Sequence, residues 1–314
     1  MSAYEPYPPQ APQARAFQVV DPILSRPHVL LASGVISGGE SWSEEVLRRA
    51  QGWARTDSLT TLRLYDIRSA SETWSVITEP YVGSLNFDDP TQGNRLETFP
   101  LSHLRAVMFT LLTALETAHS DGVVHGALCP AALVLQANGK LKLGYFSLEL
   151  LDARTGAQTE RVLRLGYFSS PGQIVGSKAT VQDDIYGLGV FLYRMVYGRY
   201  PYQALDWPPL IHLILHGTPD FPPTPAHIPD SLVSSLRRCL ARDPQERFAS
   251  VSELREALDL ETVDGEPTEE LDWPIDPVEI LPDEPEGGVL AARRPPPFRP
   301  STSQAEPTLN PDDA

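Results

Sequence analysis

The sequence predicts an α+β protein in two parts, a small strand-rich part followed by a larger helical part. Apolar runs rich in β-branched residues occur around residues 28–37, 60–68 and 73–81, with one helix-like stretch among them. Beyond residue 100, apolar residues recur at the spacings of three and four that mark amphipathic helices. Residues 259–314 differ from both parts, because they combine many prolines with most of the excess acid.

The small part is predicted to contain three strands and one helix. The helix is the sequence SWSEEVLRRAQGWAR, residues 41–55, which follows the first strand-like run. A polar SASE segment separates the second run from the third, as expected for two neighbouring strands. Residues 1–26, which begin with a stretch rich in Pro, Ala and Gln, are predicted to be disordered.

The large part is predicted to consist of helices with one hairpin near its start. Apolar spacing indicates a helix from Leu101 to about His119, and Asn138-Gly139 lies between two apolar runs as a hairpin turn does. Residues 183–198 are apolar around nearly the whole helical circumference, which predicts a buried central helix. Two further helices are expected at 230–241 and 250–258.

The C-terminal residues 259–314 are predicted to form a disordered acidic tail. They hold 15 acidic residues, 3 basic residues and 11 prolines, within a chain of net charge −16. One apolar patch, LDWPIDPVEIL at 271–281, is typical of a segment that docks either on its own large part or on another protein. Cutting after Leu258 is therefore expected to leave the fold unchanged and to weaken partner binding. The sequence RRPPPFRP, residues 293–300, is either a polyproline ligand or an unbound linker.

Charge and cysteine content exclude several classes of protein. The net charge of −16 disfavours binding to nucleic acid or to an anionic membrane surface. Two cysteines, Cys129 and Cys239, provide neither a disulfide framework nor a four-cysteine metal site, which favours a reducing, cytoplasmic location. No apolar run of about 18 residues is present, so no membrane span is predicted.

The order of elements and several motifs resemble the protein kinase fold over residues 27–258. VVHGALCPAALVL at 123–135 resembles the catalytic loop, and NGKLKLGYFS at 138–147 is similar to the strand that leads into the D-F-G motif. DDIYGLGVFLYRMVYGRYPY and RCLARDPQERF resemble later motifs of the family's large lobe. The resemblance implies a two-lobed fold, with a small lobe of about 27–84 and a large lobe of about 85–258.

The same resemblance implies that the catalytic positions hold residues unable to transfer a phosphoryl group. The family's lysine, helix glutamate, catalytic aspartate, metal-binding asparagine and D-F-G aspartate fall on Ala32, Arg49, Ala127, Ala132 and Tyr145. The chain has only three lysines, and none precedes Lys140, so no other register restores the small-lobe lysine. No cofactor and no metal ion are therefore expected.

Other residues match structural positions of the family. Four of them, Trp53, Leu64, His125 and Phe146, match its stacked hydrophobic column between the lobes. Asp184 matches the residue that holds the catalytic-loop backbone, and Arg247 is kept although its usual glutamate partner falls near Gly172. The hinge that would contact adenine is Glu79, Pro80 and Tyr81.

Several residues have two interpretations. His125 is a general base or, as we favour, a packed column residue, because no nucleophile accompanies it. Cys129 is a reactive thiol or, in the favoured reading, a small buried residue. His212 and His216 have the helical spacing of metal ligands but lack a third one, which favours a plain helix surface. Tyr145 either blocks a pocket, accepts phosphate or fills space.

The function that follows is that of a pseudokinase, a regulatory or scaffold module that binds protein partners without phosphoryl transfer. An active kinase or a phosphopeptide-reading protein is the expected kind of partner, since Thr262 and Thr268 stand among acidic residues as phosphorylation sites often do. The alternative is an atypical serine/threonine kinase that binds ATP through non-standard residues.

Overall fold

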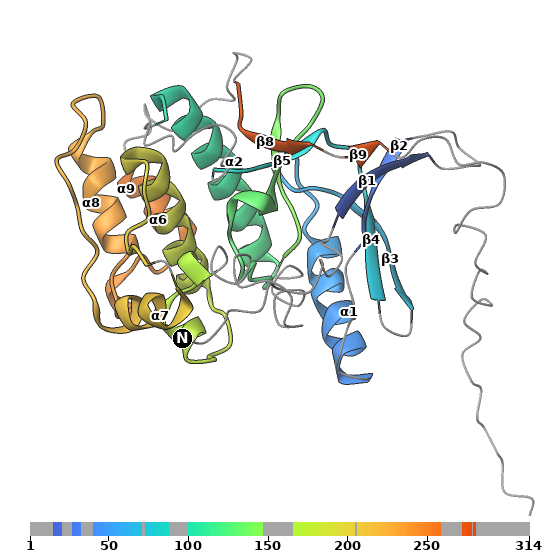
Figure 1. Ribbon diagram of the computed structural model, residues 1–314, viewed down its shortest axis with the longest axis horizontal. Helices are drawn as coiled ribbons and strands as arrows, with labels where there is room; N and C mark the ends of the chain where they lie inside the picture. Colours follow the sequence, from blue (N-terminus) through green and yellow to red (C-terminus); the bar gives the residue numbers. More distant parts are fainter. Residues whose placement is uncertain are drawn as a thin grey trace, which may run out of the picture. The chain divides into compact units, whose positions relative to one another are not determined.

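The computed structural model describes residues 15–20, 27–32, 40–70, 73–87, 99–146, 166–204, 206–258, 272–277 and 279–280 (Figure 1). All of them belong to one compact unit, residues 1–280. The predicted α+β class is confirmed, with a small lobe built on one sheet and a large lobe built mainly of helices.

The small lobe is a mixed sheet that packs against one helix. Its strands lie in the order β3-β4-β2-β1-β9, and α1 contacts β3. Three of the strands and the helix match the predicted runs in position. The elements are β1 (Arg15–Val20), β2 (Pro27–Ala32), α1 (Glu40–Arg55), β3 (Leu64–Ala70), β4 (Thr73–Thr78) and β9 (Glu279–Ile280).

The prediction of disorder across residues 1–26 is wrong for residues 15–20. This segment forms β1, which pairs antiparallel with β2 from Arg15 opposite Ala32 to Val20 opposite Pro27. Phe17, Val19 and Val20 are aromatic or β-branched residues that favour a pleated strand. The sequence analysis missed this short run because it directly follows the Pro-rich stretch. Residues 1–14 lie outside the described part of the chain.

The large lobe combines helices with a second, smaller sheet. The sheet order is β7-β6-β5-β8, from β5 (Gly83–Leu85), β6 (Leu133–Leu135), β7 (Leu141–Leu143) and β8 (Ile275–Pro277). The helices are α2 (Leu101–Ser120), α5 (Pro171–Ile174), α6 (Val181–Tyr197), α7 (Trp207–His216), α8 (Asp230–Cys239) and α9 (Val251–Ala257). Two short 3₁₀ turns, Pro130–Ala132 and Pro244–Glu246, connect them.

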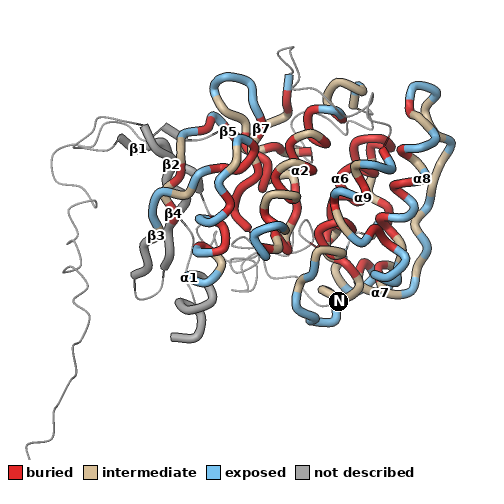
Figure 2. The backbone as a smooth tube through the Cα atoms, turned by 180° about the vertical axis from the view of Figure 1, so that it is seen from behind, coloured by how far each residue is buried: buried red, intermediate tan, exposed pale blue. Residues whose placement is uncertain are grey.

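The elements predicted for the large lobe are confirmed. The helix from Leu101 ends at Ser120, and β6 and β7 form the expected hairpin with Gly139 at a φ of 79°, where glycine has no Cβ to clash. Helix α6 is buried from Asp183 to Tyr197, as its nearly continuous apolar sequence requires (Figure 2). Ser250 caps α9 by accepting the N–H of Glu253 at 3.1 Å.

The two largest of three hydrophobic clusters among the described residues hold the domain together. The larger one lies in the large lobe, among α2, α6, α8 and α9. The second, which we call the interlobe cluster, contains Trp53, Leu62, Val76, Tyr81, Ala118, Val123, Val134, Tyr145 and Phe146. Because its members come from α1, β4, the end of α2 and β6, this cluster packs the small lobe onto the large lobe.

The prediction of a wholly disordered tail is wrong for residues 272–277 and 279–280. Ile275–Pro277 form β8 and Glu279–Ile280 form β9, which pair with β5 and β1 respectively. Trp273 is only 6% exposed and belongs to the large-lobe cluster. Of the alternatives for this apolar patch, the structure places it on its own domain. The remaining residues of 259–314, including Thr262, Thr268 and 293–300, lie outside the described residues.

Within the described ranges, none of the helices is long and apolar enough to cross a membrane.

Candidate functional site between the lobes

His125 lies in the loop between α2 and β6, and both of its ring nitrogens are engaged by the backbone. Nδ1 accepts the N–H of Ala127 at 3.2 Å, so the ring proton resides on Nε2 and is donated to the carbonyl of Gly144 at 2.9 Å. The side chain is fully buried. A histidine held in this way fixes the loop against the strand before Tyr145 and leaves neither nitrogen available to accept a substrate proton.

Asp184, in the first turn of α6, binds the backbone of the same loop. Its Oδ2 accepts the N–H of His125 at 2.8 Å, and its Oδ1 accepts the N–H of Gly126 at 2.6 Å. His119 contacts Oδ2 through Nε2 at 2.8 Å. The carboxylate is 1% exposed, so these bonds replace its water shell. The hydrogen bonds predicted between Asp184 and the loop are therefore present.

The residues predicted to form a column between the lobes lie in contact. The rings of His125 and Phe146 are 4.9 Å apart, and those of Phe146 and Trp53 are stacked with centroids 6.3 Å apart. Leu64 packs against the same interlobe cluster. Trp53 is held by a hydrogen bond from its Nε1 to the carbonyl of Leu62 at 2.6 Å. The column thus runs from the small-lobe helix to the loop.

Tyr145 fills the position that the kinase resemblance gives to the D-F-G aspartate. Its hydroxyl is hydrogen-bonded to the hydroxyl of Tyr81, which belongs to the hinge. Both side chains are buried, and the ring of Tyr145 lies 5.5 Å from that of Trp53. Tyr145 and Phe146 have φ values of 67° and 21°, uncommon for residues with side chains. The strained turn aims a phenol, rather than a carboxylate, at the hinge.

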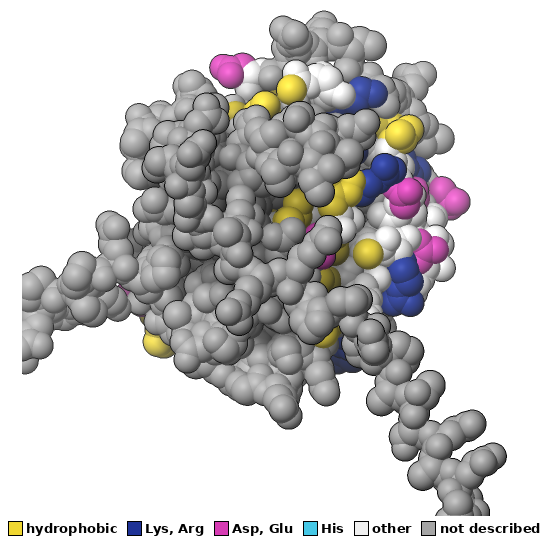
Figure 3. Space-filling view, turned by 90° about the vertical axis from the view of Figure 1, so that its right-hand side faces the viewer, with side chains coloured by type: hydrophobic (Ala, Val, Ile, Leu, Met, Phe, Trp, Pro, Cys, Tyr) yellow, Lys and Arg dark blue, Asp and Glu magenta, His cyan; other side chains and the backbone are white. Residues whose placement is uncertain are grey.

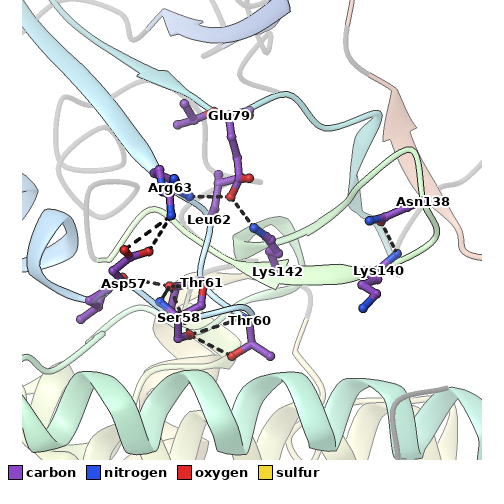
Figure 4. A network of polar contacts seen from close by, with 12 residues as sticks. Asp57, Ser58, Thr60, Thr61, Leu62, Arg63, Glu79, Asn138, Lys140 and Lys142 are labelled. Atoms are coloured by element: carbon purple, nitrogen blue, oxygen red, sulfur yellow. Dashed lines mark hydrogen bonds and ion pairs between the residues drawn. The ribbon is translucent and has the colours of Figure 1, made fainter.

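The hinge residue Glu79 is bound on two sides (Figure 4). Its Oε1 accepts the N–H of Arg63 at 2.8 Å and forms an ion pair with Nζ of Lys142 at 2.6 Å. Both side chains of the ion pair are mostly buried, at 14% and 16% exposure. Lys142 is one of only three lysines in the chain, and it is committed to linking the hinge with β7. Pro80, next along the hinge, is exposed.

The remaining positions implied by the resemblance hold small or paired residues. Ala127 follows Gly126 in the loop, and Ala132 is fully buried in the 3₁₀ turn. Arg49 lies on α1, and Ala32 ends β2 opposite Ser75 of β4. In the parts of the chain that the structure describes, no group of three or more His, Cys, Asp or Glu side chains is arranged to hold a metal ion.

Arg247 is buried, and Asp183 supplies the carboxylate nearest to it. Its guanidinium donates to the carbonyls of Ala241 at 2.8 Å and Gln182 at 2.9 Å, and lies 3.5 Å from Oδ1 of Asp183. Burial lowers the pKa of Arg247, and the charge of Asp183 partly opposes this effect. The family's glutamate is expected at the position of Gly172. A Cβ at this position would lie 3.8 Å from Oδ1 of Asp183. Asp183 therefore supplies a carboxylate both near Arg247 and next to position 172.

The structure also shows where Cys129, His212 and His216 lie, the other residues for which the sequence allowed two interpretations. Cys129 is buried in the large-lobe cluster. His212 and His216 lie on the exposed face of α7, with ring centroids 5.0 Å apart. Sequence reasoning missed the Tyr81–Tyr145 and Glu79–Lys142 contacts, because each joins residues more than sixty positions apart and neither side chain carries a local signal of its partner.

The side of the molecule at the right of Figure 1 carries charges of both signs. Figure 3 shows described basic and acidic side chains next to one another on this face, with hydrophobic side chains between them. The described part of this face therefore presents no extended field of a single sign.

Known proteins resemble this chain over most of the described region. Residues 37–258 match the family model described as protein kinase domain. The serine/threonine-protein kinase PkaA of Streptomyces coelicolor is 30% identical over 157 residues, covering 48% of this chain and 28% of PkaA. PrkC of Bacillus subtilis is 26% identical over 211 residues, covering 66% and 32%. The probable kinase CPE1738 of Clostridium perfringens is 25% identical over 232 residues, covering 72% and 33%. The chain thus matches about a third or less of each relative's length.

Proposed function

Because the chain belongs to the protein kinase domain family, we propose that it is a kinase-like regulatory or scaffold module that binds protein partners and transfers no phosphoryl group. In the family, catalysis rests on positioning and on neutralising charge with a lysine, two metal ions and an aspartate that orients the nucleophile. The proposal is that none of these parts is available here.

The observation that carries the proposal is the hydrogen-bonded pair of Tyr81 and Tyr145 between the lobes. By the resemblance, Tyr81 belongs to the adenine-contacting hinge and Tyr145 replaces a metal-binding aspartate. Both side chains are buried in the interlobe cluster together with Val134. A neutral phenol is a poor ligand for Mg²⁺, which takes carboxylates, phosphates and water. The pair therefore occupies space and supplies no charge to a phosphate.

The composition of the chain supports the same conclusion. No lysine precedes Lys140, so the small lobe has none to place on the phosphates. Lys142 is paired with Glu79. Ala127 and Ala132 offer no proton acceptor and no metal ligand in the loop. Metal ions and an oriented nucleophile supply many orders of magnitude of rate, which the residues at these positions do not provide.

The binding role is supported by exposed apolar residues in the small lobe. Leu59, after α1, is 85% exposed, and Tyr65 on β3 is 49% exposed. Such side chains contribute contact area to protein interfaces. We propose protein partners in the cytoplasm, either an active kinase or a phosphopeptide-reading protein.

Thermal melting with Mg-ATP tests the loss of nucleotide binding. A ligand at 100 times its Kd stabilises a protein by about 2.7 kcal/mol, which would raise the Tm by roughly 5–10 °C for a domain of this size. We expect no shift at millimolar Mg-ATP and no transfer of phosphate to protein substrates. The PrkC kinase domain serves as the positive control. The variant Tyr81→Ala, which removes one ring from the pair, shows whether space alone prevents binding of adenine.

A Mg-dependent rise in the Tm of the unmodified chain, together with phosphate transfer, would establish instead an atypical kinase. A rise with adenine nucleotides that needs no metal would leave the module inactive but able to bind nucleotide.

A further inference from the structure

A short C-terminal segment, residues 272–277 and 279–280, pairs with one edge of each sheet; we call it the strap. β8 runs antiparallel to β5, with Leu85 opposite Ile275 and Gly83 opposite Pro277. β9 then runs parallel to β1, with Phe17 opposite Glu279. Figure 1 shows the two strands, in red, following one another from β5 to β1. The strap lies beyond the region that matches the kinase family, residues 37–258.

The strap has one aromatic anchor, Trp273. The ring is 6% exposed and meets the ring of His103 edge-on at 4.6 Å. His103 also contacts the carbonyl of Asp272 through Nε2 at 2.9 Å. The N–H of Asn86, just after β5, donates to the carbonyl of Pro274 at 2.8 Å. We call the edge of β5 with Asn86 and His103 the strap site.

These contacts define the kind of peptide that the strap site accepts. Strand pairing uses backbone atoms and is tolerant of sequence, whereas a buried aromatic residue selects for its own shape and size. The contact at position 274 uses a carbonyl, so the N–H that proline lacks is not needed there. Ile275 packs against the large-lobe cluster. The site therefore fits an extended aromatic-proline-aliphatic peptide.

The strap is held by few bonds. β8 pairs with β5 through three residues, and β9 pairs with β1 through two. Besides these, the strap contacts His103 and the N–H of Asn86, and it buries one aromatic side chain, Trp273. A segment attached to the same chain nevertheless competes at an effective concentration on the order of millimolar. Its release would open a strand edge and an aromatic pocket together, and a free edge with a pocket beside it is a common peptide-binding surface.

We propose that the strap site is a docking surface for a segment of a protein partner with an aromatic-proline-aliphatic sequence, and that the strap occupies it in the same chain as a built-in competitor. Partner binding then displaces the strap from β5 and frees the edge of β1. This inference is independent of whether the domain transfers phosphate.

A labelled peptide with the sequence LDWPIDPVEIL, residues 271–281, tests the proposal on the full chain. The variant Trp273→Ala loosens the strap and leaves the site intact, so it is expected to bind the peptide. The unmodified chain should bind at least about tenfold more weakly, because its own strap competes. A peptide with alanine in place of the tryptophan should bind neither chain. Fluorescence anisotropy measures all three affinities.

Matched variants locate the binding. Ile275→Asp is a second way to loosen the strap if Trp273→Ala unfolds, which circular dichroism shows. Trp207→Ala removes a tryptophan of α7 that does not touch the strap site and should behave like the unmodified chain. Adding His103→Ala to Trp273→Ala should reduce peptide binding at least about tenfold, since an anchor contact is lost.

Three results would overturn the proposal. The first is that both loosened chains fold and bind no peptide. The second is equal binding to the unmodified and loosened chains, or binding that His103→Ala leaves unchanged. The third is a dimer of the unmodified chain that dissociates in Trp273→Ala, seen by size-exclusion chromatography with light scattering; the occupant would then be the strap of a second copy.

Discussion

Replacing Asp184 with alanine is expected to destabilise the domain strongly. The carboxylate accepts the N–H groups of His125 and Gly126 at 2.8 and 2.6 Å and contacts His119 at 2.8 Å. The loop N–H groups are buried, so after the substitution no water replaces their partner. Each unsatisfied buried donor costs about 1–3 kcal/mol. His119 keeps some exposure and contributes less, so we expect a loss of about 2–5 kcal/mol in the free energy of unfolding.

Differential scanning calorimetry or thermal melting by circular dichroism measures this loss. For a domain of 150–250 residues, 1 kcal/mol corresponds to roughly 2–4 °C, so the Tm should fall by about 5–15 °C. Asp184→Asn should cost less, because its one carbonyl oxygen still accepts one of the two N–H groups. Asp220→Ala is the control, since Asp220 forms an exposed ion pair with Arg199 and such pairs contribute about 1 kcal/mol or less.

If Asp184→Ala melted within about 1 °C of the unmodified chain, the loop would not depend on this carboxylate. The ring bonds of His125 to Ala127 and Gly144 would then be enough to hold the loop in place.

Three further predictions concern packing, reactivity and pH. Gly189→Ala should destabilise the domain by about 1–3 kcal/mol, because a Cβ would lie 2.6 Å from Cβ of Cys239 where α6 meets α8; Gly52→Ala, with 3.4 Å of room, is its control in denaturant unfolding. Burial raises the pKa of Cys239 to about 12, so the thiol should resist a maleimide at pH 8 in the folded protein and react once it is unfolded. The N–H of Ala249 and then Arg238 lower the pKa of Glu253, so the stabilisation by this carboxylate is present above its unfolded pKa and is lost as the pH falls through the lower folded pKa; the difference in Tm from Glu253→Gln should shrink as the pH falls below 4.5 and disappear once the carboxyl is protonated in the folded protein.

The sequence predicted those parts of the fold that carry local patterns. Helices α2 and α6 follow from apolar spacing, and the hairpin follows from Asn138-Gly139. The bond between Asp184 and the loop was predicted from the family motif, which preserves a contact across 58 and 59 positions. Motifs therefore supplied the long-range information that periodicity lacks.

The strap was not predicted, because strand pairing at a sheet edge leaves little trace in the strand's own sequence. The prolines of residues 259–314, Pro277 among them, favoured disorder, yet proline is tolerated on an edge strand whose N–H groups are not all needed. Trp273 signalled that the segment docks somewhere. Its location depended on His103 and Asn86, which no pattern connects with it.

The contact between Asp183 and Arg247 was missed for a different reason. The family motif assigns the partner of the arginine to the position of Gly172, and sequence alone indicated only a loss. Asp183 is the first residue of the helix predicted over 183–198, and in the structure it accepts the N–H of Thr180 at 2.8 Å. Its other oxygen faces Arg247 and the hydroxyl of Ser170, a second role visible only in three dimensions.

The pairing of β9 with β1 has a consequence for the order in which the domain folds. Phe17 lies opposite Glu279, so a strand near the start of the chain meets one near the end of the described residues. During synthesis β1 is made first and its outer edge stays open until β9 has left the ribosome, at about 5–20 residues per second. Contacts between such distant residues form late and slowly. Nascent chains therefore expose this edge for many seconds, the period in which they depend most on chaperones and are most prone to aggregate.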